Sequence, residues 1–149
     1  MRTALAAILL LAASGPAFAD DSIRITFQSG ECIGCSAERS EIYISRPIGP
    51  GPIQLIDLDR FFALILRSLH EADMPLSWHL VPAIHSDEVR VDILMGGKRY
   101  SFSSGYENGR VQGSVGESLA DQRRRHALED ILRQTAEYAA RRYRSNKSE

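Results

Sequence analysis

Two pairs of adjacent turn residues constrain the fold of this chain more than any other feature. Gly96-Gly97 and Asn108-Gly109 each separate two runs in which apolar and polar residues alternate. Glycine and asparagine adopt the positive φ angles that two-residue hairpin loops require, so each pair predicts a β-hairpin. Two successive hairpins make an antiparallel meander. The cross-strand pairs that follow are Ile93 with Tyr100, Val91 with Phe102, Asp92 with Ser101, Arg90 with Ser103, Glu107 with Arg110 and Tyr106 with Val111.

Three further segments alternate with the period of two that is typical of half-buried strands. They are SIRITFQ (22–28), EIYIS (41–45) and LSWHLV (76–81). We expect the first two to pair as neighbours and the third to begin the meander. The proline- and glycine-rich segment 46–52 is predicted to be a loop, because neither a helix nor a central strand tolerates that composition.

Helical spacing of apolar residues predicts two helices. One begins with Asp57 as its N-cap and ends before Pro75; the other begins at Ser118, with Asp121 completing a capping box, and ends near Tyr143. The resulting order predicts the α+β class. Its antiparallel sheet consists of an N-terminal strand pair and a four-strand meander, accompanied by one central and one long C-terminal helix.

The N-terminus has the organisation of a secretory signal peptide. Arg2 provides the positive charge, ALAAILLLAA (4–13) the apolar region, and GPAFA (15–19) the small residues at a cleavage site. We therefore predict a signal peptide over residues 1–19 and a single exported α+β domain over residues 20–149, located in the periplasm or secreted. No second apolar run is long enough to predict a membrane span, so the domain is expected to be soluble.

The charge balance and the arginine-rich helix bear on the choice of partner. The chain has 18 basic and 19 acidic residues, and loss of Arg2 with the signal peptide leaves 17 against 19. This even balance excludes a general nucleic-acid-binding role. The arginines of the last helix alternate with acidic residues four positions away, which is typical of a solvated helix face. They are weak candidates for binding an acidic partner: Arg123, Arg124, Arg141 and Arg142.

The only two cysteines, Cys32 and Cys35, stand three residues apart after the first predicted strand. In an exported protein they are expected to form a disulfide that clips the connection between two strands. The alternative is a redox-active pair, with Cys32 as the nucleophile and Cys35 as the resolving thiol. A C-x-x-C segment after a strand resembles the active site of thioredoxin-like oxidoreductases. The polar segment after Cys35 and the strand pattern that follows favour the structural disulfide.

Other chemistries have less support in the sequence. His70, His79, His85 and His126 could complete a zinc site with the two cysteines, but no two of them have the spacing of a helical zinc motif. Neither a hydrolase elbow nor a complete phosphate-binding loop is present. We therefore predict no metal and no cofactor.

These observations favour binding over catalysis. The leading hypothesis is a soluble periplasmic domain that binds another exported protein in the envelope, as an inhibitor or immunity-type protein does. The first alternative is a thiol–disulfide oxidoreductase or redox-sensitive chaperone that uses Cys32 and Cys35. The second is a structural component of a cell-envelope complex that docks through its arginine-rich C-terminal helix.

Overall fold

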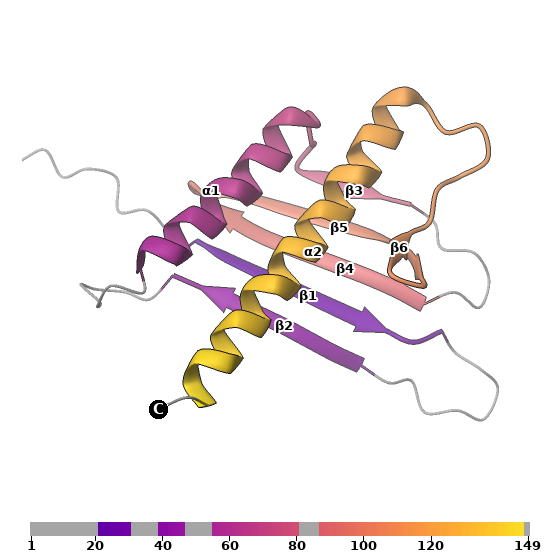
Figure 1. Cartoon of the computed structure of the whole chain (residues 1–149). Helices are drawn as coiled ribbons and strands as arrows, with labels where there is room; N and C mark the ends of the chain where they lie inside the picture. The colour runs from indigo at the N-terminus through magenta and orange to yellow at the C-terminus, as the bar shows by residue number, and fades with distance from the viewer. Residues whose placement is uncertain (1–20, 31–38, 47–54, 81–86, 148–149) are drawn as a thin grey trace, which may run out of the picture.

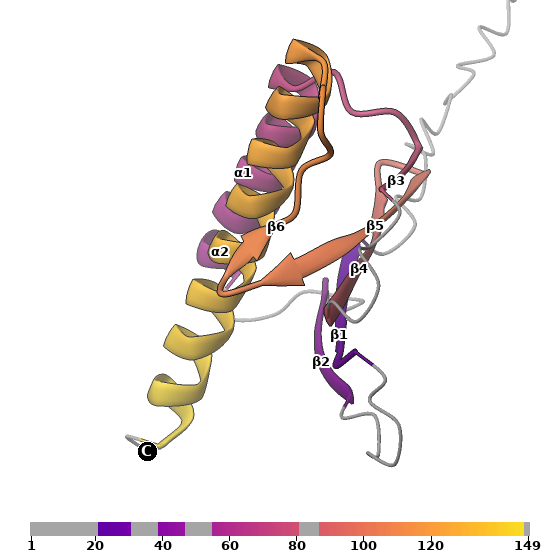
Figure 2. The same cartoon turned by 90° about the vertical axis from the view of Figure 1, so that its right-hand side faces the viewer.

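The computed structural model of the chain describes residues 21–30, 39–46, 55–80 and 87–147. Its elements, in chain order, are β1 (Ser22–Gln28), β2 (Arg39–Ser45), α1 (Leu55–Glu71), β3 (Ser77–His79), β4 (Asp87–Met95), β5 (Lys98–Glu107), β6 (Arg110–Val111) and α2 (Leu119–Lys147). The six strands form one sheet in the order β2-β1-β4-β5-β3, with β6 also paired to β5 (Figure 1). Both helices lie side by side on the same side of this sheet (Figure 2). The chain is therefore an α+β protein, as predicted.

The two predicted hairpins are confirmed. Val91 pairs with Phe102 and Ile93 with Tyr100 across the first turn, and Tyr106 pairs with Val111 across the second. The φ angles are positive at all four turn residues, namely Gly96, Gly97, Asn108 and Gly109. The turn residues therefore set the register of β4, β5 and β6.

The prediction of a wholly antiparallel sheet with a four-strand meander is wrong at β3. This strand pairs in parallel with β5, with Trp78 beside Phe102, so the sheet is mixed and the meander contains only β4, β5 and β6. The reason lies in the other neighbours of β4. One side of β4 is taken by β5 and the other by β1, so β3 cannot pair with β4 and pairs with the outer edge of β5 instead. Alternation predicts a strand but specifies neither its partner nor its direction.

The core fills the space between the sheet and the two helices. The alternating residues of β1, β4 and β5 that face the helices are almost fully buried, among them Ile25, Val91 and Phe102. They meet the apolar faces of α1 and α2, which include Ile65 and Leu128. Apolar burial of this kind is the main stabilising contribution to the fold.

The helices begin close to their predicted positions, and α2 extends beyond its predicted end. Helix α1 begins at Leu55, before the expected cap at Asp57. Ser118 caps the N-terminus of α2 as predicted, because its hydroxyl accepts a hydrogen bond from the Asp121 backbone N–H at 3.1 Å. Its C-terminus lies at Lys147 instead of near Tyr143.

The side chain of Asp121 also joins α2 to the sheet. Its carboxylate accepts hydrogen bonds from the Ser118 hydroxyl at 2.8 Å and from the Trp78 indole at 3.3 Å. These two bonds hold the pKa of Asp121 below its usual value, since they favour the charged form. Such a group stabilises the fold above its unfolded-state pKa and ceases to do so as pH falls through its folded-state pKa.

We therefore expect acid to loosen the contact between α2 and β3. Trp78 is the only tryptophan of the chain, so its fluorescence reports this contact directly. Its emission should change in a step on the acid side of about pH 4, and Asp121→Asn should remove that step. An identical step in the Asn variant would show that other carboxylates cause it.

Candidate functional site

One face of the sheet carries no described helix and forms a polar surface, which we call the open face. The strand registers arrange its side chains in rows that cross the sheet. One row runs Glu41, Thr26, Arg90, Ser103 and His79. The next row runs Tyr43, Arg24, Asp92, Ser101 and Ser77, and Gln28, Arg39, Glu88 and Arg99 lie at the ends of the face.

Charges of both signs alternate on the open face, and two of its arginines have no acidic partner among the described residues. Glu41 forms ion pairs with Arg24 at 3.4 Å and with Arg39 at 3.6 Å. The guanidinium of Arg24 also lies 5.0 Å from the centre of the Tyr43 ring, a cation–π contact. In the part of the chain that the structure describes, Arg90 and Arg99 form no ion pair. These two guanidinium groups are therefore available to a partner.

The centre of the open face is hollowed. A depression of about 310 Å³ is lined by side chains of β1, β2 and β4, including Arg24, Thr26, Arg39, Arg90 and Asp92. Hydrogen-bond donors and acceptors line it instead of apolar groups. It therefore suits a charged or strongly polar group of a partner, and not an apolar ligand.

His79 lies at one edge of the open face and joins β3 to β5. Its Nδ1 atom is 2.7 Å from the Ser103 hydroxyl, and its Nε2 atom is 2.8 Å from the Ser77 hydroxyl. A serine beside a histidine is also found in hydrolases, but there a carboxylate orients the ring. Here both ring nitrogens are hydrogen-bonded to serine hydroxyls. His79 therefore links β3 to β5 through hydrogen bonds.

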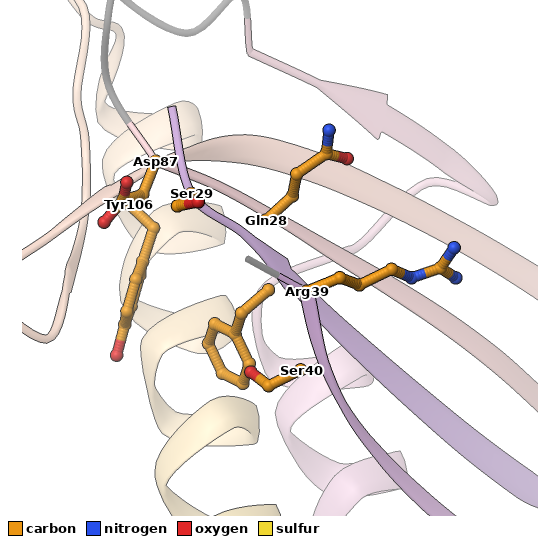
Figure 3. Close-up of a pocket in the computed structure, with 7 residues that line it drawn as sticks. Gln28, Ser29, Arg39, Ser40, Asp87 and Tyr106 are labelled. Carbon is orange, nitrogen blue, oxygen red and sulfur yellow. The ribbon is translucent and has the colours of Figure 1, made fainter. Parts of the chain in front are cut away.

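A second hollow lies at a corner of the sheet, where β1 ends and β2 begins (Figure 3). It has a volume of about 440 Å³, and its described lining includes Phe27, Tyr106, Ser40 and Asp87. The rings of Phe27 and Tyr106 are in contact, with centroids 5.3 Å apart. Asp87 accepts a hydrogen bond from the Gly30 backbone N–H at 2.9 Å, and Figure 3 shows Arg39 directed away from the Tyr106 ring. This corner could accommodate an apolar side chain, and the carboxylate in its described lining, Asp87, is engaged by the Gly30 backbone N–H.

The structure separates the four arginines that the sequence suggested as a binding site. Arg123 and Arg124 lie in the first turns of α2, about 27 Å along the helix from Arg141 and Arg142. Arg124 pairs with Asp121 at 3.3 Å and therefore stabilises the helix start. Arg123 is exposed, as are Arg141 and Arg142. The four do not form one patch.

Arg125 belongs to the helix face that the charge pattern predicts to be solvated, but it is partly buried beside the start of α2. It binds Glu117, the residue before the helix cap, through hydrogen bonds of 3.1 to 3.2 Å. Glu117 raises the pKa of the Arg125 guanidinium, mainly through these hydrogen bonds. The segment before α2 is thus tied to the helix.

Cys32, Cys35 and His85 lie outside the described residues, so the predicted disulfide remains a prediction. Residues 31–38 connect β1 to β2, which are antiparallel neighbours, and Gln28 pairs with Arg39. From Arg39 the chain forms a strand, whereas a thioredoxin-like site requires a helix after the cysteine pair. Among the described residues, no three His, Cys, Asp or Glu side chains converge as metal ligands would.

The open face was not recognised from sequence as a candidate site. Its residues occur as the polar half of each alternating strand, which by itself indicates only the solvent side. The available signal was the number of arginines at these positions, namely Arg24, Arg39, Arg90 and Arg99. Grouping them required the pairing of β1 with β4, which no turn specifies.

Comparison with known proteins gives no relative. No family model matches the chain, and neither a curated protein nor a solved structure matches it. Neither described helix combines the length and the apolar character that crossing a membrane requires.

Proposed function

We propose that this chain is an exported binding domain that recognises another protein of the cell envelope through the open face, in the manner of an inhibitor or immunity-type protein. The observation that carries the proposal is the open face itself. It displays Arg90 and Arg99, which form no ion pair among the described residues, and Tyr43, whose exposed fraction is 54%. Arginine and tyrosine are enriched in protein–protein interfaces and among the residues that dominate their binding energy.

The pattern of charge on the open face supports a protein as the partner. Positive and negative side chains alternate along β4, where Glu88, Arg90 and Asp92 occupy successive positions of this face. A surface of both signs is matched by a partner with the complementary pattern, which fixes the register of binding and rejects other partners. A simple anion would meet Glu88 and Asp92 as well as Arg90.

The contacts of Asp21 are compatible with removal of the N-terminal segment. Its side chain accepts a hydrogen bond from the Gly96 backbone N–H at 3.0 Å, and its carbonyl accepts one from Arg46 N–H at 2.8 Å. Arg46 also forms an ion pair with the Asp21 carboxylate at 3.6 Å. Cleavage after Ala19 would leave all of these contacts in place.

A site-specific photocrosslinking experiment tests the open face. A photoreactive residue at Thr26 or Ser101 should crosslink one discrete envelope protein, while the same residue at Arg67 or Ala136, exposed on the helices, should not. With that protein purified, Arg90→Glu should weaken binding by tenfold or more, on the order of the loss of one interfacial charge contact. Arg67→Glu, which has the same charge change, should bind normally. Equal crosslinking from the helices and the sheet would reject the proposal.

A further inference from the structure

Strand β2 has a free edge whose backbone groups can be assigned from the ladder. Arg46 N–H donates to the Asp21 carbonyl, which makes this pair a hydrogen-bonded one. Hydrogen-bonded and non-bonded pairs alternate in an antiparallel ladder. Ser40, Ile42 and Ile44 therefore direct their backbone groups toward β1. The residues between them direct their N–H and C=O groups outward: Arg39, Glu41, Tyr43 and Ser45.

In the described part of the chain, no strand pairs with this edge. It presents seven residues of regular strand, from Arg39 to Ser45. An unpaired edge of this length is a template for an additional strand. Peptide-binding domains use such edges to bind an extended segment of a partner.

The last turns of α2 continue past this edge on the helix side of the sheet (Figures 1 and 2). Tyr138 is the last buried residue of the helix and stacks on Phe61, with ring centroids 4.7 Å apart. Arg142 follows Thr135 by seven positions and Leu128 by fourteen, so it continues the buried side of the helix, whereas Arg141 lies over the Tyr138 ring on the side toward α1. Both arginines are exposed. The buried side of α2 thus changes from apolar to cationic in its last turns.

These two arginines are available for an external carboxylate. Glu137, the nearest acidic residue along the helix, pairs with Arg133 at 3.0 Å. Arg141 lies over the Tyr138 ring, and neither Arg141 nor Arg142 forms an ion pair among the described residues. From Arg141 to Lys147 the sequence has four basic residues and no acidic one. The last turns of α2 therefore carry a net positive charge.

This charge argues against a second copy of the chain as the occupant. Antiparallel pairing of β2 with itself relates the two copies by a two-fold axis beside the strand. That symmetry brings the cationic end of each α2 toward the other, and like charges at close range oppose association. A segment carrying acidic side chains meets no such repulsion.

We propose that the free edge of β2 and the Arg141–Arg142 side of α2 together bind an extended acidic segment of a partner protein. The segment adds to the sheet as a strand beside β2. Its backbone pairs with the outward groups of Glu41 and Tyr43, and its alternate carboxylates face Arg141 and Arg142. The inference rests on the proposed function in taking a protein as the partner, but it uses a surface separate from the depression around Arg90.

The test uses two labelled seven-residue peptides, one alternating valine with glutamate and the other valine with lysine. Fluorescence anisotropy with the purified protein should show binding of the glutamate peptide only, weakening as salt is added. Arg141→Glu combined with Arg142→Glu should reduce its affinity by about tenfold or more. The matched control, Arg110→Glu with Arg123→Glu, has the same charge change at exposed sites elsewhere and should bind normally.

Strand addition is tested separately with Tyr43→Pro. Proline at this position removes an outward N–H and leaves the bonds to β1, as edge strands tolerate. It should abolish peptide binding, whereas Tyr43→Thr, which keeps the N–H, should retain it. Circular dichroism identifies any variant that fails to fold. If Tyr43→Pro is misfolded, strand addition is tested with an isotope-edited infrared spectrum of the peptide bound to the unaltered protein. Strand addition requires a β-sheet amide band in that spectrum.

Failure of the glutamate peptide to bind, or equal binding of the lysine peptide, would overturn the inference. So would normal binding to a folded Tyr43→Pro variant or an unordered amide band. Arg90→Glu should leave peptide binding unchanged, because Arg90 lies on the open face. A partner that crosslinks to the open face while the peptide fails to bind would reject this inference alone.

Discussion

Phe102→Ala should lower the free energy of unfolding by about 3–5 kcal/mol, enough to leave a domain of ordinary stability of about 5–15 kcal/mol only marginally folded. Phe102 is fully buried at the centre of β5. It pairs with Val91 on one side and with Trp78 on the other. Truncation therefore leaves a cavity between three strands and the helices, which the sheet cannot close by collapsing.

Chemical denaturation followed by circular dichroism measures this effect. Tyr43→Ala serves as the control, because it also removes a ring from a strand but at an exposed site. It should change the unfolding free energy by less than about 1 kcal/mol. A larger loss in Tyr43→Ala than in Phe102→Ala would mean that the sheet faces are assigned the wrong way round.

Leu128→Ala should cost about 2–5 kcal/mol. Leu128 is fully buried on the side of α2 that faces the sheet, and Leu119 on the same helix has an exposed fraction of 75%. Leu119→Ala makes the same chemical change and should be nearly neutral. The comparison separates core packing from helix propensity, since both positions belong to one helix.

The burial of Leu128 also bears on the idea that α2 as a whole is a docking helix. Its apolar face is occupied by the core of its own domain, so only its exposed residues remain for a partner. If Leu128→Ala left stability unchanged, α2 would have to be regarded as loosely attached. The peptide-binding site proposed at the free edge of β2 would then lose its support, because it depends on the position of α2.

Local features of the chain were predictable where short-range chemistry decides them. Positive φ angles at Gly96-Gly97 specify a turn, and the turn specifies that Val91 faces Phe102. The same holds for the Ser118–Asp121 cap, whose hydrogen bonds lie within one helical turn. In these cases the interacting groups are close in sequence, so the pattern contains the contact.

The candidate sites were predictable only in part, for the opposite reason. The pairing of Arg90 with Ser103 follows from the hairpin, but the neighbouring row that contains Arg24 depends on β1 joining β4, far away in the sequence. Arg141 and Arg142 were recognised in the sequence as basic residues, but their role depends on their position relative to the sheet. The sequence could not show that α2 extends past the edge of the sheet at this point.

By itself the sequence determined the elements, the two hairpin registers and the alternation of each strand, because turn chemistry and periodicity act over a few residues. Only the tertiary structure decided the order of the strands, the parallel direction of β3 and the position of α2 across the edge of β2. These depend on which apolar faces bury each other best. That competition involves the whole chain, so an arginine such as Arg142 acquires its place beside a free strand edge only in the folded protein.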